Sequence, residues 1–419
     1  MGMTRYTSKG KPYRELLKGS IMTNSKKLLL NVTYGLKLIV VILLLACCGY
    51  GHSPVKSAPP PTRDWTRYPA VVEVDKSPGD IFAVSDPHAH YQRLTHVLMK
   101  AELLGLNYIR GKTIPDWRGN NAVLVVIGDL IDKNPTGSLQ VINLLRALQT
   151  DAASKGGQVI VTMGNHEAEF LADWNGNKTA KFRDELTEAG LNPQSVANCQ
   201  GDLGQWLCNL PLAARVGDWF FAHAGYTKGR SISQLNSDIA RSFNDERENG
   251  FKAPEITGKN SILNADLDKD GPGGRPWFKD SQRGTNPEEV LRRYATALGV
   301  RHIVQGHKPG NVDFKNGLER SRGEMFHAYG LLFLIDGDLN SVLDSGNDDN
   351  YGAALRIYVE MSTSYGTTTT IGPNPTPEPT PEPRCITVTT EAIAIKKDGS
   401  QKTFWKGTEQ KRASGEPCQ

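Results

Sequence analysis

The sequence of 419 residues contains no hydrophobic run long enough to cross a bilayer as a helix. Its longest apolar stretch, from Leu38 to Ala46, falls well short of the roughly 20 residues that such a helix needs. Cysteine is scarce, with six residues in all, and no Cys-x-x-Cys pair occurs, which argues against a structural zinc knuckle. No internal repeat is present, and the overall composition is that of an ordinary globular protein.

Net positive charge is confined to the N-terminal region. Residues 1–46 hold eight Lys and Arg and a single acid, a charge of +7, whereas the whole chain carries +4, so the remainder carries 4 − 7 = −3. An acidic remainder gives no electrostatic reason to expect nucleic acid as a partner. The sequence also has no stripe of basic and aromatic residues of the kind that nucleic-acid surfaces use.

The N-terminal region places its basic residues before the apolar stretch, which is the order of a secretory signal. The letters "LLAC" at residues 44–47 resemble the cleavage box of bacterial lipoproteins, in which Cys47 would carry the lipid, and Cys48 offers a second register. An uncleaved signal anchor and a plain secretory signal are the alternatives. We therefore expect an exported protein of the bacterial cell envelope, either periplasmic or bound to the membrane as a lipoprotein.

Composition divides the chain into five segments. Residues 1–47 form an N-terminal extension with the signal or lipoprotein segment, and residues 48–78 form a tether rich in Ser, Pro and charge. A globular domain is expected over 79–362, and a linker over 363–384, where proline at every second position from Pro373 to Pro383 favours an extended chain. Residues 385–419 are expected to form a small C-terminal β-rich module, because "CITVTTEAIAI" has a strand-like pattern.

Four cysteines lie outside the signal region, and an even number in an oxidising compartment suggests two disulfides. Local pairing, Cys199 with Cys208 and Cys385 with Cys418, is the simplest of three possible connectivities. The alternative is that some of these residues are free, buried thiols. A bridge between Cys385 and Cys418 would help to hold a C-terminal segment that is too small for a core of its own.

The globular domain alternates strand and helix patterns. The β-branched runs "AVLVVIGD" and "QVIVTMGN" are typical of buried strands, and the segment between them has apolar residues at helical spacing. This order predicts a β-α-β unit, in which two parallel strands are joined by a crossover helix. The fold class is therefore α/β.

Polar side chains that can bind a metal ion follow most of the predicted strands. Because strand ends on one edge of a sheet converge, residues far apart in the sequence can form one site there. Taken singly, each has an ordinary structural explanation, such as a loop cap or a hydrogen-bonded histidine, and only their joint occurrence favours a site. The candidates are Asp86 and His88 in "SDPHAH", Asp129 and Asp132 in "GDLID", Asn165 and His166 in "GNHE", His223 in "HAG" and His307 in "GHKP".

The five motifs that hold these residues resemble, in the same order, those of the calcineurin-like metallophosphoesterase superfamily. The resemblance covers residues 85–307, with Ala89 in place of a usual glycine in the first motif. The segment "DGPGGRPWFKD" at 270–280 loosely resembles an element of the Shewanella-like phosphatases, a branch near the phosphoprotein phosphatases. The resemblance implies a four-layer α/β/β/α metallophosphoesterase sandwich.

The resemblance also implies a role for each candidate residue. His166 would be the general acid that protonates the leaving alkoxide, oriented by Asp132. The carboxylate and imidazole ligands suit two divalent ions of Mn, Fe or Zn better than Ca, and such a pair would hold a hydroxide for in-line attack on phosphate. The resemblance places on the first ion Asp86, His88 and Asp129, with Asp129 bridging to a second ion bound by Asn165, His223 and His307.

The residues expected to bind substrate depart from the family pattern. Lys133 stands where phosphoprotein phosphatases place a phosphate-binding Arg, and Lys279 stands at the Arg of a Gly-Pro-x-Trp-x-Arg element. Lysine keeps the charge but loses the bidentate guanidinium, for which Arg275 would compensate. These changes weaken the expectation of a protein phosphatase more than that of a metal-dependent hydrolase.

We therefore expect an exported, metal-dependent phosphoric monoester hydrolase acting on phosphoprotein Ser, Thr or Tyr residues or on small phosphate esters. A phosphodiesterase or nucleotide hydrolase built on the same site is one alternative, although the charge of −3 outside residues 1–46 argues against nucleic acid as its substrate. A surface binding protein with a vestigial hydrolase domain is another, since the tether, the linker and the C-terminal segment all allow it.

Overall fold

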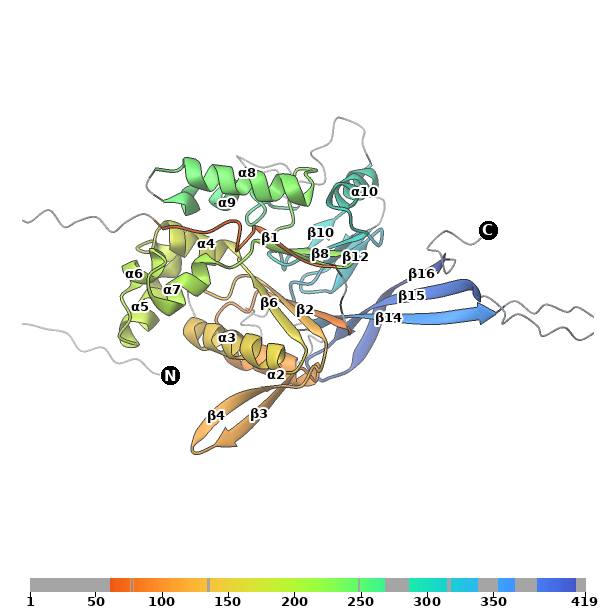
Figure 1. The fold of residues 1–419 in the computed structure, drawn as a ribbon, viewed down its shortest axis with the longest axis horizontal. Helices are drawn as coiled ribbons and strands as arrows, with labels where there is room; N and C mark the ends of the chain where they lie inside the picture. The colour runs from red at the N-terminus through yellow and green to blue at the C-terminus, as the bar shows by residue number, and fades with distance from the viewer. Residues whose placement is uncertain are drawn as a thin grey trace, which may run out of the picture. The chain divides into compact units, whose positions relative to one another are not determined.

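The computed structural model describes residues 61–75, 77, 79–133, 136–247, 249–267, 286–314, 318–337, 353–365 and 383–411. Within these residues, two six-stranded sheets pack face to face, and helices cover their outer faces (Figure 1). The predicted four-layer sandwich is therefore confirmed. The apolar stretch from Leu38 to Ala46 lies outside the described residues, and no described helix has the length and hydrophobicity needed to span a bilayer.

The first sheet contains the predicted β-α-β unit. Three parallel strands, β2, β5 and β6, are continued beyond β2 by three antiparallel strands. Every residue of β2 and β5 is buried, because helices cover one face of the sheet and the second sheet covers the other. The strands in their order across the sheet are β16 (Gln401–Lys411), β15 (Pro383–Ile395), β14 (Ala354–Tyr365), β2 (Ile81–Ser85), β5 (Val123–Ile127) and β6 (Gln158–Thr162).

The second sheet is mixed. Its strands β8, β9 and β13 are parallel, and β7 pairs with β8 in the antiparallel sense. The order across this sheet is β1 (Val71–Val74), β7 (Ala213–Val216), β8 (Trp219–Ala222), β9 (His302–Gln305), β13 (Leu332–Leu334) and β12 (Phe326–Ala328). Two short pairs complete the described strands: β3 (Leu104–Ile109) with β4 (Lys112–Trp117), and β10 (Val312–Asp313) with β11 (Glu319–Arg320).

Helices form the two outer layers. The helices α2 and α3 lie on the first sheet, and α8 and α10 lie over the second (Figure 1). The described helices are α2 (Tyr91–Lys100), α3 (Ser138–Ser154), α4 (Asn165–Ala172), α5 (Ala180–Glu188), α6 (Pro193–Ala197), α7 (Gly201–Cys208), α8 (Ile232–Asp245), α9 (Pro254–Thr257) and α10 (Pro287–Leu298), with 3-10 turns at Asn177–Thr179 and Gly250–Lys252.

The side chains of β2 alternate between the two faces of the sheet, so this one strand contributes to two hydrophobic cores. Because successive side chains of a strand point to opposite faces, Phe82 and Val84 join the core with the helices, whereas Ile81 and Ala83 join the core between the sheets. The two cores therefore hold the helices, the first sheet and the second sheet in a fixed order. They also fix the position at which β2 ends.

The strand-rich region expected at the C-terminus is present, and it shares the core of the globular domain. The strand β15 pairs along its length with β14, and β14 pairs with β2, so the C-terminal strands continue the first sheet. Ala392 and Ala394 of β15 contribute to the core between the two sheets. A segment too short for a core of its own is thereby stabilised by a core that already exists.

One of the two expected disulfides lies within the described residues. Cys199 and Cys208 are bonded, which closes the turn between α6 and α7. Cys418, the expected partner of Cys385, lies outside the described residues, as do Cys47 and Cys48. The second bridge and the lipid attachment therefore stay predictions.

Candidate metal centre

The candidate residues converge at one edge of the sandwich, as their positions at strand ends predict. Asp86 and His88 follow β2, and Asp129 follows β5. Asn165 and His166 form the first turn of α4, directly after β6. His223 and His307 follow β8 and β9 of the second sheet, so both sheets contribute to the cluster.

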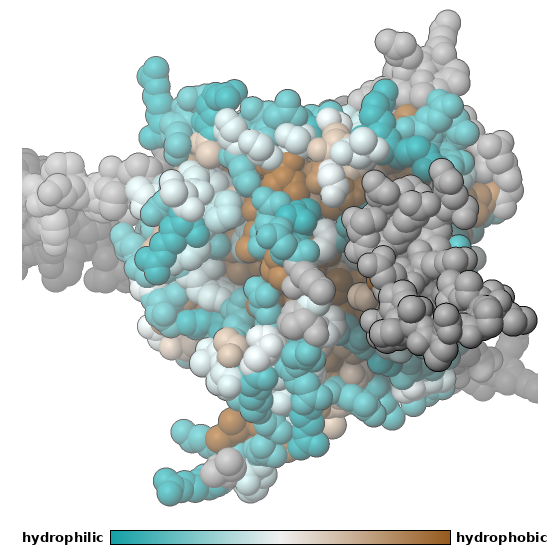
Figure 2. Space-filling model, turned by 45° about the vertical axis from the view of Figure 1, so that its right-hand side comes forward, coloured by the Kyte–Doolittle hydropathy of each residue, from teal (hydrophilic) through white to brown (hydrophobic). Residues whose placement is uncertain are grey.

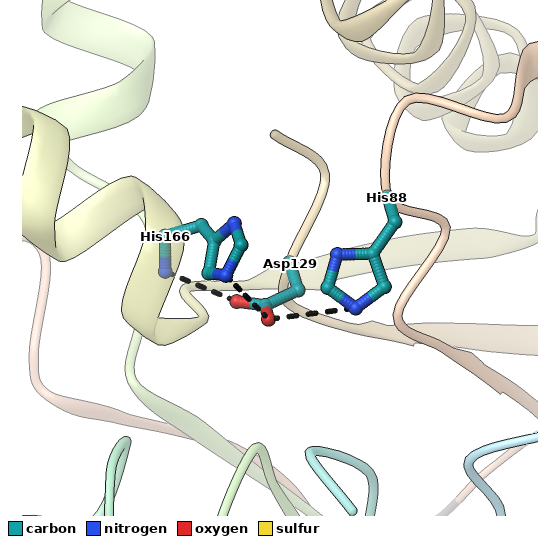
Figure 3. Close-up of side chains that lie close together, drawn as sticks. All are labelled: His88, Asp129 and His166. Atoms are coloured by element: carbon teal, nitrogen blue, oxygen red, sulfur yellow. Dashed lines mark hydrogen bonds and ion pairs between the residues drawn. The ribbon is translucent and has the colours of Figure 1, made fainter. Parts of the chain in front are cut away.

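Asp129 lies at the centre of the cluster and faces two groups of histidines. Its Oδ2 atom is 3.8 Å from Nε2 of His88 and 3.8 Å from Nε2 of His166. Figure 3 shows the two histidine rings on opposite sides of this carboxylate. Its Oδ1 atom is 3.3 Å from Nε2 of His223, which lies 3.1 Å from Nδ1 of His307. Each group of three side chains is compact enough to bind one metal ion, and Asp129 belongs to both groups.

Asp86 and Asn165 lie against the same histidines. The Oδ1 atom of Asn165 is 3.0 Å from Nε2 of His223. Asp86 places Oδ1 3.7 Å from Nδ1 of His223 and 3.9 Å from Nε2 of His88, and both of its oxygens accept the backbone N–H of His307 at 3.0 Å. The structure thus brings all six predicted ligands together.

The backbone around the cluster is strained. Asp86, His88, Asp129 and His307 have φ values of 51°, 43°, 50° and 66°, in the left-handed region that costs a non-glycine residue about 1–3 kcal/mol. Glycines permit the close approach of the loops. A Cβ atom on Gly306 would lie 2.0 Å from Oδ2 of Asp86, so the loop of His307 could not approach Asp86 with any other residue there.

Burial and the positive charge of nearby histidines oppose each other at the two central carboxylates, Asp86 and Asp129. Both are almost inaccessible to solvent. Burial, the nearby charge of Asp336 and that of Asp129 raise the pKa of Asp86 well above its usual value. Burial acts in the same direction on the pKa of Asp129, but the surrounding histidines, above all His166 and His223, hold it well below its usual value. Acidic groups packed in this way are stabilised by positive charge between them.

The two histidines contributed by the second sheet respond in opposite ways. Burial lowers the pKa of His223, but the charges of Asp129 and Asp86 outweigh it and raise the pKa to about 10. Burial and the neighbouring charge of His223 lower the pKa of His307 to about 3. Nδ1 of His223 donates to the carbonyl oxygen of Ile127 at 3.1 Å, which directs Nε2 toward the other ligands. The ring is therefore oriented for coordination.

The predicted general acid is oriented differently from our expectation. Nδ1 of His166 donates to the carbonyl oxygen of Ile131 at 2.9 Å, and Nε2 faces Asp129. The carboxylate of Asp132, expected to orient His166, lies 3.5 Å from Nδ1 of His88 and accepts the backbone N–H of Lys133. The orienting contact at His166 Nδ1 thus comes from the main chain, one residue before the expected side chain.

The predicted substrate-binding residues are only partly described. The side chain of Lys133 is exposed to solvent directly after Asp132. Arg275 and Lys279 lie outside the described residues, so their placement in the site stays a prediction.

Glu167 is a site residue that we did not identify from the sequence. It is completely buried, and its Oε2 atom accepts the backbone N–H groups of Asp129 and Gly164 at 2.9 and 2.8 Å. Its Oε1 atom accepts those of Leu130 and Ile131 at 2.8 and 2.9 Å. One carboxylate therefore joins the loops that carry Asp129 and His166. The signal in the sequence was its place three residues after Gly164, the residue before α4, where a glutamate can accept the backbone N–H of the N-cap residue.

Asp336 and Arg320 form a second buried layer behind the candidate ligands. Asp336 follows β13, and its buried carboxylate is the charged group that most raises the pKa of Asp86. The guanidinium of Arg320 is buried and donates to the carbonyl oxygen of Asp336 at 2.6 Å and to that of Lys308. Arg320 thus connects the loop after β13 to the loop that carries His307.

Comparison with known proteins places the chain in a family. A family model described as calcineurin-like phosphoesterase matches residues 79–311, more than half of the chain. Shewanella-like protein phosphatase 1 of Plasmodium berghei is 26% identical over 233 residues, which cover 55% of this chain and 61% of the relative. A symmetrical bis(5'-nucleosyl)-tetraphosphatase of Vibrio parahaemolyticus is 28% identical over 133 residues, 32% of this chain and 43% of the relative. The chain therefore spans less than two thirds of each of these two relatives.

A solved structure shares the fold. The cold-active protein-tyrosine phosphatase of a psychrophilic Shewanella species covers 80% of this chain with 82% of its own, at a TM-score of 0.52 and 17% identity. The chain therefore resembles this protein in its fold, in addition to matching the family in the five sequence motifs.

Proposed function

We propose that this chain, which belongs to the calcineurin-like phosphoesterase family, is an exported phosphatase that hydrolyses phosphomonoesters with two divalent metal ions. The observation that carries the proposal is the position of Asp129. It offers one oxygen to the group of His88 and His166 and the other to the group of His223 and His307. A carboxylate shared in this way is what a bridging ligand requires.

The donors in the cluster fit Mn, Fe or Zn. Imidazole nitrogens and carboxylate oxygens together suit these ions better than Ca, which prefers oxygen alone. Asp86, His88 and Asp129 would hold one ion, and Asp129, Asn165, His223 and His307 the other. Such a pair of ions supplies Lewis acidity toward the phosphate oxygens and the attacking water.

The protein's own contribution to the reaction is proton transfer and orientation. Because Nδ1 of His166 is held by the carbonyl oxygen of Ile131, its Nε2 faces the cluster and can give a proton to the leaving alkoxide. Glu167 accepts the backbone N–H groups of Asp129 and Gly164, and so holds in place both the loop of Asp129 and the chain just before His166. Asp132 is assigned to the orientation of His88, its neighbour in the structure.

Substrate class and location are supported by separate observations. Similarity to a protein phosphatase supports a phosphomonoester, either on a protein or on a small molecule. Lys133, Arg275 and Lys279 are proposed to bind the phosphate group. The bonded pair of Cys199 and Cys208 supports an oxidising compartment, and so agrees with export.

A comparison of phosphomonoester and phosphodiester hydrolysis tests the proposal. The full chain would be stripped with a chelator, reloaded with Mn, Fe or Zn in turn, and assayed with p-nitrophenyl phosphate and bis-p-nitrophenyl phosphate. We expect loss of turnover on chelation, recovery with at least one ion, and preference for the monoester. Activity that survives chelation would contradict the metal assignment, and preference for the diester would contradict the substrate class.

A nucleotide hydrolase is the second candidate, because a symmetrical bis(5'-nucleosyl)-tetraphosphatase is among the similar proteins. The same reloaded enzyme would be given a bis(5'-nucleosyl) tetraphosphate in competition with p-nitrophenyl phosphate. A higher kcat/KM for the dinucleotide would replace the first candidate with the second. A surface protein with a vestigial domain would bind the ions without turning over either substrate.

A further inference from the structure

The hairpin of β3 and β4 projects from the sandwich, at the bottom of Figure 1 and of Figure 2. Its base is fixed, because Leu104 and Trp117 are buried in the core with the helices, and the N–H of Trp117 donates to Asp151 at 2.6 Å. Beyond the base, Leu106, Tyr108 and Ile114 are 39%, 76% and 44% exposed. A firmly attached element thus presents three large apolar side chains to solvent.

The apolar side chains lie on both faces of the hairpin. Leu106 and Tyr108 are two residues apart on β3 and share one face. Ile114 is paired with Asn107, so it lies on the other face. A flat protein partner would cover one face and leave the other in water, whereas a medium that surrounds the tip covers both.

The end of the hairpin is positively charged. Arg110 and Lys112 flank Gly111 at the turn, are exposed, and form no ion pair with any residue that the structure describes. The acid nearer the base, Asp116, is instead bound by Arg118 and Lys155. The tip therefore offers two unshielded cations next to its apolar residues, a combination that complements an anionic surface with an apolar interior.

We propose that the tip of this hairpin inserts into the headgroup region of an anionic lipid bilayer. Tyr108 suits that depth, because its ring is apolar and its hydroxyl is polar. The expected anchor at Cys47 would leave only residues 48–60 before the described chain, a reach of at most about 45 Å. The sandwich would then stay close enough to the membrane for the hairpin to touch it.

The hairpin and the metal centre lie at opposite ends of the first sheet. The hairpin precedes β5, at the end where that strand begins, whereas Asp129 follows the end where β5 finishes. Binding through the hairpin therefore leaves the cluster facing away from the bilayer and open to substrates in solution. The proposal does not depend on which phosphoester the cluster hydrolyses.

Local hydrogen–deuterium exchange on the full chain tests this proposal. The N-terminal segment is expected to bind vesicles by itself, so the measurement is exchange at residues 106–114 and not total binding. Vesicles of phosphatidylcholine alone would be compared with vesicles that also contain phosphatidylglycerol. We expect exchange in the hairpin to slow several-fold only with the anionic vesicles.

Two double variants separate the contribution of the charged residues at the tip from that of the apolar residues. Arg110→Gln with Lys112→Gln should weaken the protection about fivefold for each charge removed, and Tyr108→Ser with Ile114→Ser should abolish it. Leu191→Ser, which removes an exposed apolar residue elsewhere, should leave it intact. All variants should retain phosphatase activity in solution, which keeps a failure here distinct from a failure of the proposed function. Equal protection by neutral vesicles, or by soluble polyglutamate in place of lipid, would overturn the proposal.

Discussion

The strands β8 and β9 carry buried histidines at both ends, and the two ends behave in opposite ways. At one end, His223 lies between carboxylates, which raise its pKa to about 10. At the other end, His302 stacks on Trp219 with ring centroids 4.1 Å apart and meets Trp405 of β16 at 4.8 Å. Burial lowers the pKa of His302 to about 4.

The difference shows that neighbouring charge, and not burial alone, decides the state of a buried histidine. His302 donates Nδ1–H to the carbonyl oxygen of Gly330 at 2.7 Å, and aromatic rings surround the remainder of its ring. It therefore acts as an apolar residue with one satisfied donor. The same pair of strands thus has one end built for stability and one end built for chemistry. Substitutions at the two ends should consequently affect different measurements.

The largest expected effect on activity comes from a substitution at the end of β8 and β9 that carries His223, which we call the polar end. Asp129→Asn removes the charge shared by both histidine groups, so we expect phosphatase activity to fall to background. The side chain keeps its shape, and the thermal unfolding temperature should remain close to that of the wild type. Activity comparable to the wild type would show that Asp129 is not a bridging ligand.

His166→Asn should have the next largest effect. The loss of a general acid lowers kcat by about 10²–10⁴-fold. If His166 transfers a proton without holding an ion, metal content should be unchanged, and a substrate with a better leaving group should recover much of the rate. A parallel loss of bound metal would instead make His166 a ligand, as its proximity to His88 and Asp129 allows.

At the other end of β8 and β9, the apolar end, His302 should make the free energy of unfolding depend on pH. Its pKa is about 4 in the folded protein and near 6.5 in the unfolded chain, so the unfolded state binds more protons between these values. The associated stability is fully present above pH 6.5 and falls by about 3 kcal/mol as the pH drops to 4. Denaturant unfolding of the wild type and of His302→Gln across this range measures the difference. Identical pH dependence would show that His302 does not titrate in this way.

The smallest expected effect is from Trp405→Ala. This partly buried side chain joins β16 to Trp219, His302 and Phe333 of the second sheet. Its removal should lower the free energy of unfolding by about 2 kcal/mol. Activity and metal content per folded molecule should stay at the wild-type level, since the aromatic end is separate from the ligands. A selective loss of metal would contradict that separation.

The clustering of the candidate ligands could be predicted because each of them follows a strand or opens a helix. The apolar runs before Asp86, Asp129 and His223 locate the strands, and parallel strands bring their ends together. Local order in the sequence is then enough to infer proximity in space.

Residues that act through the backbone could not be predicted in the same way. Arginine usually lies at the protein surface, so nothing in the sequence indicates that Arg320 is buried. Only the folded chain shows that its guanidinium donates hydrogen bonds to the carbonyl oxygens of two distant loops. Asp336 lies before a glycine, a pattern that turns share. The contact between β15 and β14 likewise depends on pairing across the proline-rich segment, which no local pattern reveals.

Metal content is the most direct test of the bridging arrangement around Asp129. The full chain would be loaded with Mn or Zn, passed through a desalting column, and analysed by mass spectrometry for metal per folded molecule. We predict two ions per chain in the wild type and in Trp405→Ala, and at most one in Asp129→Asn. Two ions retained by Asp129→Asn, or fewer than two in the wild type, would contradict the arrangement.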